Sequence, residues 1–148
     1  EMGIGNTSSA TAMFAKLYEL KAHECVGAGT GLDKQGIEHK ARIIQEGLKR
    51  FSIKNLSREE RAFEVLRQVG GLELATLVGV CLAAVQKQKI ILLDGFLSAV
   101  VALVAKEFCP HVVDYMIASH VSHEQAHQHS LQILGKTPLL DLKMCLGE

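Results

Sequence analysis

The chain has 148 residues, enough for one domain that buries a hydrophobic core, and 48% of them are hydrophobic. Its 16 basic and 16 acidic side chains cancel, so the composition provides no general electrostatic attraction to nucleic acid or to an acidic membrane surface. The absence of tryptophan and an aromatic content of 5% also argue against a surface that stacks bases.

The first half of the chain predicts helices separated by two glycine-containing loops. The opening EMGIGNTS places two glycines before Asn, Thr and Ser, the residue types that cap a helix, and such a helix start suits an anion. Apolar spacing predicts a helix over 11–21, which Ser8 or Ser9 begins, and another over 34–50. The loop GAGTGL and the capping residue Asp33 lie between them. Ser57 and Glu60 predict a capping box for a helix over 59–69.

The second half predicts strands that alternate with helices. Residues 72–86 are expected to form a buried helix, and the apolar run KIILLDGF at 89–96 a buried parallel strand. An apolar helix over 97–107 should end before Pro110, followed by a second strand over 111–120. The last elements expected are an amphipathic helix over 122–134, closed by Gly135, and a short extended or helical piece over 138–148.

This alternation is typical of an α/β protein with a parallel sheet flanked by helices, and we expect residues 1–148 to form a single domain. In such sheets ligands bind beyond the carboxyl ends of the strands. The polar segments expected near those ends are 1–8, 27–31, 94–95 and 119–122. Their convergence predicts one binding site.

The cysteines and the chain ends indicate a cellular setting. No secretory leader is visible, and the longest apolar segment, 74–85, is shorter than the roughly 20 residues that a membrane helix needs. Because the sequence begins at Glu1 and ends at Glu148 without a polar tail, we expect a fragment of a longer protein. The four cysteines, Cys25, Cys81, Cys109 and Cys145, form no CxxC pair. This pattern favours reduced thiols in a cytoplasmic protein.

The glycine-rich loop VGAGTG is the clearest candidate for a phosphate site. It lacks the third glycine of a dinucleotide fingerprint, so a generic phosphate-cradling loop is favoured, with a purely structural turn as the alternative. Lys40, one to two turns into the following helix, can reach back to a phosphate, although a lone lysine is more often a solvated surface residue.

Three further groups have competing interpretations. In HVSHEQAHQH, His123 and His127 are four residues apart, but without an HExxH pattern a solvated amphipathic face is favoured over a metal site. Asp94 can hold ribose hydroxyls or a cationic group, or simply cap the next helix. Glu148 can be a general base if an apolar pocket raises its pKa, or only a terminal carboxylate.

Six blocks of the sequence together resemble one enzyme family. They are EMGIGNTS, VGAGTGLDKQGIEHK, EVLRQVGGLELATLVGV, ILLDGF, YMIASHVSHE and LLDLKMCLGE. In this order the sequence is similar to the nicotinate-nucleotide–dimethylbenzimidazole phosphoribosyltransferases, the CobT family, over essentially all its length. The resemblance implies transfer of the phosphoribosyl group of nicotinate mononucleotide to dimethylbenzimidazole, without a cofactor or metal. It also implies a homodimer and a Rossmann-like parallel sheet. That sheet is expected to be incomplete here, because relatives carry a large N-terminal region that supplies its first strands.

The resemblance also implies roles for individual residues. Glu148 matches the family's catalytic base, Glu1 a second carboxylate of the active site, and Met2 and Leu146 lie near the acceptor base. The residues expected at the nucleotide are Gly3, Asn6, Gly27, Gly29, Gly31, Lys40, Asp94, Gly95 and Ser122, with Ser119 as the alternative to Ser122.

Two other functions stay open at this point. One is a non-catalytic nucleotide-binding module, and the other is the same transfer to a different aromatic acceptor base, since the acceptor pocket is expected largely in the region that relatives carry upstream.

Overall fold

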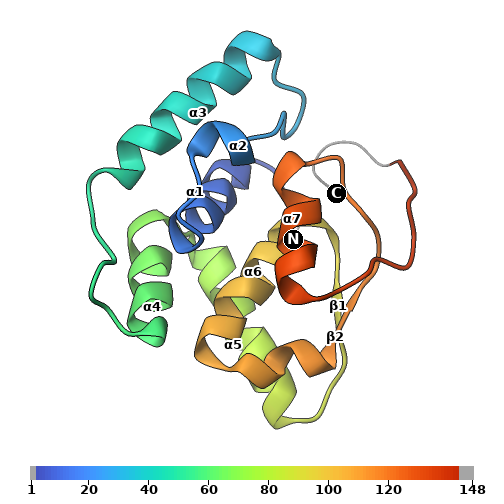
Figure 1. Ribbon diagram of the computed structural model, residues 1–148. Coiled ribbons are helices and arrows are strands. Elements are labelled where there is room, and N and C mark those ends of the chain that lie inside the picture. Colours follow the sequence, from blue (N-terminus) through green and yellow to red (C-terminus); the bar gives the residue numbers. More distant parts are fainter. Residues whose placement is uncertain (1–2, 144–148) are drawn as a thin grey trace.

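The computed structural model describes residues 3–143 and is mostly helical (Figure 1). The elements in chain order are α1 (Thr7–Leu17), α2 (Ala22–Cys25), α3 (Lys34–Leu48), α4 (Arg58–Val69), α5 (Leu72–Gln86), β1 (Ile91–Leu93), α6 (Gly95–Phe108), the 3-10 helix η1 (Pro110–Tyr115), β2 (Met116–Ala118) and α7 (Gln125–Leu134).

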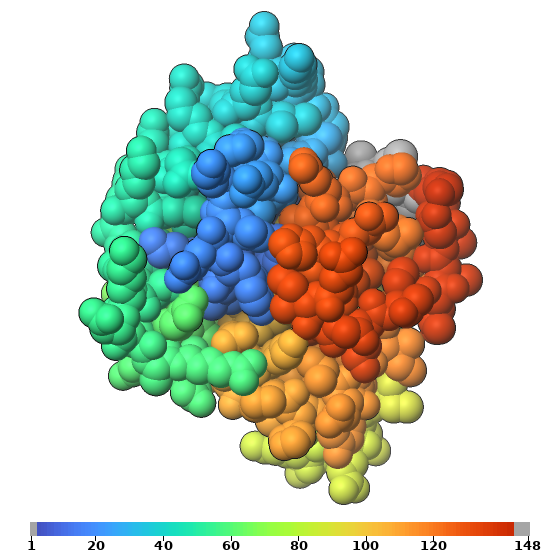
Figure 2. All heavy atoms as spheres, in the orientation of Figure 1, coloured from blue at the N-terminus to red at the C-terminus, as the bar shows by residue number. Residues whose placement is uncertain are grey.

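Helix α6 is the centre of the core. Its sequence GFLSAVVALVAKEF is apolar on nearly every side, and 10 of its 14 residues are buried. A helix that is apolar all round must be covered all round. Helices α1, α4, α5, α7 and η1 all contact it, which explains its place in the middle of Figure 1. Figure 2 shows the outer surface of α7 beside that of the first two helices, and α2 does contact α7.

The two strands form a parallel pair on either side of α6 in the sequence. The register places Ile91 opposite Met116 and Leu93 opposite Ala118. Parallel neighbours need a long crossover, here α6 with η1. Both strands therefore end at the same edge, and Asp94 and Ser119 follow directly.

The predicted α/β class is only partly right, because within residues 3–143 the sheet has two short strands. The strand expected over 89–96 is reduced to β1, since Gly95, with φ +75°, already begins α6. The strand expected over 111–120 is reduced to β2. Pro110 fixes its own φ at a helical value and begins η1, which runs to Tyr115.

Two helix starts are confirmed by their caps. The Asp33 side chain accepts a 2.8 Å hydrogen bond from the Gly36 N–H at the start of α3. The Ser57–Glu60 capping box at the start of α4 is also present. Helix α1 begins at Thr7, just ahead of the expected start at Ser8 or Ser9, with Asn6 in the N-cap position, and it ends at Leu17 instead of residue 21.

Two other helices differ from expectation. Helix α5 has the predicted bounds, but the expectation that it is buried is wrong: Leu72 is 89% exposed, and only Leu74, Val78 and Cys81 are buried. Helix α7 begins at Gln125 instead of residue 122, because the Ser122 hydroxyl accepts from the Glu124 N–H in a turn ahead of the helix. Gly135, with φ +68°, closes α7 as predicted.

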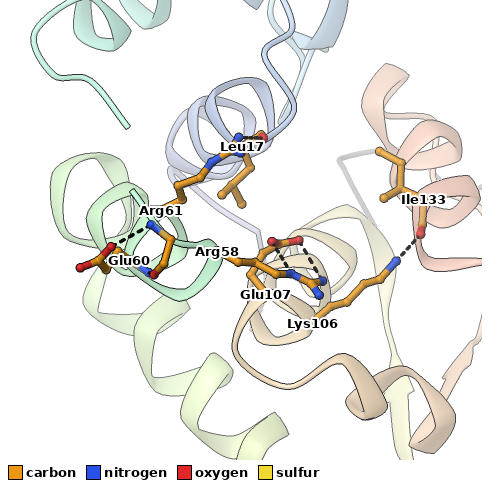
Figure 3. A network of polar contacts seen from close by, with 8 residues as sticks. Leu17, Arg58, Glu60, Arg61, Lys106, Glu107 and Ile133 are labelled. Carbon is orange, nitrogen blue, oxygen red and sulfur yellow. Dashed lines mark hydrogen bonds and ion pairs between the residues drawn. The ribbon is translucent and has the colours of Figure 1, made fainter. Parts of the chain in front are cut away.

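Basic side chains tie the helices together at their carboxyl ends (Figure 3). Arg61 on α4 donates to the Leu17 carbonyl at the end of α1 at 3.0 Å, and Lys106 on α6 donates to the Ile133 carbonyl of α7 at 2.7 Å. The last carbonyls of a helix have no partner inside it, so cations there satisfy acceptors and complement the dipole. Arg58 pairs with Glu107 at 2.8 Å and joins α4 to α6.

Two properties bear on the expected cellular setting. In the range 3–143 no helix is both long and apolar enough to cross a bilayer. Over the same range Cys25, Cys81 and Cys109 are free thiols, and burial raises the pKa of Cys25 to about 11.

Candidate functional site

The carboxyl edge of the β1–β2 pair brings together two predicted site residues. Ser119 donates to the Leu93 carbonyl through both its backbone N–H, at 3.0 Å, and its hydroxyl, at 2.6 Å. Asp94 lies beside this serine at the start of α6. It occupies the N-cap position of α6, as the alternative interpretation expects, but its side chain is 82% exposed and makes no cap hydrogen bond. Buried His120 places Nδ1 3.6 Å from Asp94 Oδ1.

The second predicted cluster is built around Lys40, which is only 7% exposed. Its ammonium donates to the Thr7 hydroxyl at 2.9 Å and to the Gly27 carbonyl at 3.3 Å. The interpretation as a solvated surface lysine is therefore wrong. Burial lowers the pKa of Lys40, and the nearby Glu124 carboxylate opposes that shift.

Gly29 is required at the centre of this cluster. Its φ of +56° is strained for other residues, and a Cβ would lie 2.9 Å from Thr7 Oγ1 and 3.5 Å from Lys40 Nζ. Its N–H donates to Glu124 Oε1 at 2.7 Å. Gly31 also has a positive φ, +111°, but its Cβ position is open, so its backbone conformation shapes the loop without a close side-chain contact there.

The segment that precedes α1 lies between the two clusters. Gly3 is buried with φ +71°, and a Cβ there would lie 2.8 Å from Leu97 Cδ1 in the first turn of α6, two residues beyond Gly95. Asn6 donates to Glu73 Oε1 at 3.2 Å, and its buried Oδ1 has no hydrogen-bond partner within the described range. Residues 3–7 thus touch both α6 and, through Thr7, Lys40.

The turn before α7 contributes buried polar groups. The Ser122 N–H donates to His127 Nδ1 at 2.7 Å, and its hydroxyl oxygen accepts from the Glu124 N–H at 3.1 Å. Burial, and next the neighbouring His120, lower the pKa of His127 to about 4, so this imidazole is neutral near pH 7.

The solvated histidine face predicted for 120–129 is therefore wrong for His120 and His127, which are buried, and right only for exposed His123 and His129. His123 precedes α7, so it shares no helix face with His127. Within residues 3–143 no group of three His, Cys, Asp or Glu side chains is placed to hold a metal ion.

Sequence reasoning missed Thr7 and Glu124 as members of the cluster and gave no role to His120 and His127. Thr7 carried a signal, since it follows the two glycines of EMGIGNTS at a helix start. Glu124 carried a weaker one, as a carboxylate directly after Ser122 in the loop beyond β2. A pocket of about 300 Å³ opens on this side and is lined by residues 121–125, Gln128, Asp141 and Lys143.

Four predicted site residues lie outside the described residues: Glu1, Met2, Leu146 and Glu148. Their roles at the acceptor base and in catalysis stay predictions. Of the others, Gly3, Asn6, Gly27, Gly29, Lys40 and Ser122 lie in or beside the Lys40 cluster and the loop before α1, and Asp94, Gly95 and Ser119 at the strand edge.

Comparisons with known proteins match the whole chain. A family model described as "Phosphoribosyltransferase" covers residues 1–148. The nicotinate-nucleotide–dimethylbenzimidazole phosphoribosyltransferase of Syntrophotalea carbinolica is 44% identical over 148 residues, which are 100% of this chain and 41% of that protein. The protein of the same name from Pseudomonas aeruginosa is 43% identical over 148 residues, with 100% and 41% covered.

A solved structure agrees with these sequence matches. The crystal structure of CobT from Thermus thermophilus superposes with a TM-score of 0.89 at 36% identity, covering 98% of this chain and 42% of that one. The chain thus spans about 41% of the length of the curated relatives it matches. Because the family model matches all 148 residues and the solved structure shares the fold, the chain belongs to the phosphoribosyltransferase family of the CobT proteins.

Proposed function

We propose that the chain is part of an enzyme that transfers the phosphoribosyl group of nicotinate mononucleotide to dimethylbenzimidazole, giving α-ribazole 5′-phosphate and nicotinate in cobalamin assembly. The observation that carries the proposal is the buried Lys40 ammonium beside Gly27 and Gly29, in a chain that matches the family throughout. A cation beside a glycine loop is the arrangement that a phosphate needs.

The described contacts support distinct roles around the nucleotide. Lys40 and the loop 27–31 would take the phosphate, and exposed Asp94 at the strand edge would accept from ribose hydroxyls. Ser122 is the better of the two serines for the phosphate. The Ser119 hydroxyl donates its proton to the Leu93 carbonyl, whereas the Ser122 oxygen accepts from Glu124 and keeps its own proton for a ligand.

The chemistry requires little acid and one base. Nicotinate leaves from a nucleotide in which it is already cationic, so its departure needs no strong proton donor. Attack by a benzimidazole nitrogen on the opposite face of the ribose carbon gives the inverted α linkage. The attacking ring must then lose its N–H proton, and Glu148 would accept it with Glu1 nearby. Such general-base assistance contributes about 10²–10⁴-fold, and the phosphate contacts add positioning of the ribose.

The proposal extends to organisation and location. One continuous buried cluster joins the helices from α1 to α7, which supports a single domain over 1–148. Exposed Phe63, Leu72 and Val80 on α4 and α5 offer apolar surface for the homodimer implied by the family. Free Cys25 and Cys81 suit the reducing cytoplasm. Sedimentation of the full-length protein should give the mass of two chains.

The test of the catalytic assignment is Glu148→Gln in the full-length protein, with Glu59→Gln on the exposed side of α4 as the matched control. We expect turnover of the Glu148 variant to fall by about 10²-fold or more, while the control keeps it. Unchanged turnover in Glu148→Gln would remove Glu148 from the role of base.

A further inference from the structure

Glu124 is a buried carboxylate that has no role in the proposed reaction. It is 5% exposed and occupies the N-cap position of α7, but its side chain does not cap that helix. The carboxylate instead reaches across to the glycine-rich loop, 95 residues earlier in the chain, where Oε1 accepts the Gly29 N–H at 2.7 Å. A hydrogen bond to an ionised acceptor is among the stronger ones in proteins.

The loop is shaped to receive this carboxylate. A Cβ on Gly27 would collide with Glu124 Oε2, so the backbone at Gly27 approaches the carboxylate more closely than another residue would allow. Oε2 is buried and has no hydrogen-bond partner within the described range. Glu124 therefore holds two glycines of the loop at once, one by a hydrogen bond and one by direct packing.

The same carboxylate provides the countercharge for Lys40. Among residues 3–143, three elements face the ammonium: α1 through the Thr7 hydroxyl, the loop through the Gly27 carbonyl, and the turn before α7 through Glu124. The first two are neutral acceptors, and within the described part of the chain Glu124 is the charged group that acts on Lys40. Burial lowers the pKa of Lys40 and Glu124 raises it, so the carboxylate favours the charged form.

We propose that Glu124 is a positioning residue for the phosphate group of the substrate nucleotide. It holds the loop 27–31 in its phosphate-binding shape and keeps Lys40 protonated inside the cluster. The inference rests on the proposed function, which places the phosphate at this loop. It adds a residue that acts through Gly29 and Lys40 without touching the reacting atoms.

A competing arrangement has the opposite consequence. If the Glu124 carboxylate merely filled the place of the phosphate, an incoming anion would have to displace it. Neutralising Glu124 would then tighten phosphate binding. A positioning role predicts weaker binding instead, so the sign of the change separates the two.

The test compares Glu124→Gln with Glu38→Gln in the full-length protein. Gln preserves the size of the side chain, and Glu38 is an exposed carboxylate on α3, two residues from Lys40, so both variants lose the same charge. Calorimetric titration with inorganic phosphate and with nicotinate mononucleotide should show about tenfold weaker binding or more for Glu124→Gln. Glu38→Gln should bind as the wild type does. Equal or tighter binding by Glu124→Gln overturns the proposal.

A second measurement needs no ligand and separates positioning from misfolding. The Lys40 side-chain ¹³Cε resonance, followed against pH by NMR, should titrate at lower pH in Glu124→Gln than in the wild type. An unshifted or upward-shifted titration contradicts the proposal, as does a wild type that binds neither phosphate nor the nucleotide. A wild type that binds both but forms no product leaves the Glu124 inference standing and overturns the proposed reaction.

Discussion

The Lys40 ammonium donates a 2.9 Å hydrogen bond to the Thr7 hydroxyl, and both side chains are buried. This contact joins α3, which follows the glycine-rich loop, to the first residue of α1, which follows the N-terminal glycines. Two residues 33 positions apart in the chain thereby bring the two glycine-containing loops together. The ammonium also lies against the Gly27 carbonyl of the glycine-rich loop, at 3.3 Å.

Replacing Lys40 should therefore affect binding of the nucleotide. In Lys40→Met the stem is kept and the ammonium is lost, and we expect KM for nicotinate mononucleotide to rise by roughly 10–100-fold, the worth of a hydrogen bond to a charged group. The matched control is Lys34→Met, an exposed lysine in the first turn of the same helix. Steady-state kinetics on the full-length protein check this. Equal KM values in the two variants would place the phosphate elsewhere.

Gly29 should tolerate no side chain. In Gly29→Ala the backbone φ of +56° is strained by about 1–2 kcal/mol, and the new Cβ would crowd Thr7 Oγ1. We expect a lower unfolding midpoint together with weaker nucleotide binding. Gly47→Ala, in the open last turn of α3, should instead keep or raise stability, because alanine favours a helix. If both variants melted at the wild-type temperature, the strain at Gly29 would be refuted.

The sequence allowed the helices to be located because their signals are local. Asp33 and the Ser57–Glu60 pair fix helix starts through contacts three residues away, and Gly135 ends α7 through its own backbone conformation. The lengths of the strands were overestimated, because an apolar run does not show how many of its residues form the strand. Gly95 ends the first run by starting α6, and Pro110 starts η1, which takes up the first half of the second run.

Asp94 should matter for activity and not for stability. Its carboxylate is 82% exposed, so Asp94→Asn should change the free energy of unfolding by no more than about 0.5 kcal/mol. If it holds the ribose, the same substitution should raise KM or lower kcat by several-fold or more. Asp114→Asn, at an exposed carboxylate of η1 beside His111, serves as the control for charge loss. If the Asp94 variant had the same KM and kcat as the control, Asp94 would have no role in binding the nucleotide.

The site could be predicted only in part, because contacts between residues far apart in the chain leave no periodic pattern in the sequence. A lone lysine in a sequence is more often a surface residue, and the buried position of Lys40 becomes visible only with its contacts to Thr7 and Gly27, 33 and 13 residues away. His127 looked solvated because α7 is amphipathic, yet its imidazole faces inward to accept from the Ser122 N–H.

Acid should destabilise the fold through His127. Its pKa is about 4 in the folded chain against 6.5 for the free side chain, so the unfolded chain binds more protons between these values. The free energy of unfolding is therefore unaffected by the titration of His127 above about pH 6.5. It falls by up to roughly 3 kcal/mol as the pH drops toward 4.

Urea unfolding between pH 4 and 7.5 measures this loss. His127→Asn keeps an acceptor for the Ser122 N–H without the titration, and its stability should depend less on pH than that of the wild type. His23→Asn, at an exposed position of α2, should retain the full dependence. A His127 variant that loses stability in acid as steeply as the wild type would show that another group is responsible.

The most direct test of the central claim is the identity of the product. Full-length protein incubated with nicotinate mononucleotide and dimethylbenzimidazole, analysed by proton NMR of the ribose anomeric position, should release nicotinate and accumulate the α-linked ribazole phosphate. Release of nicotinate without a new base–ribose bond, or a β-linked product, would contradict the account.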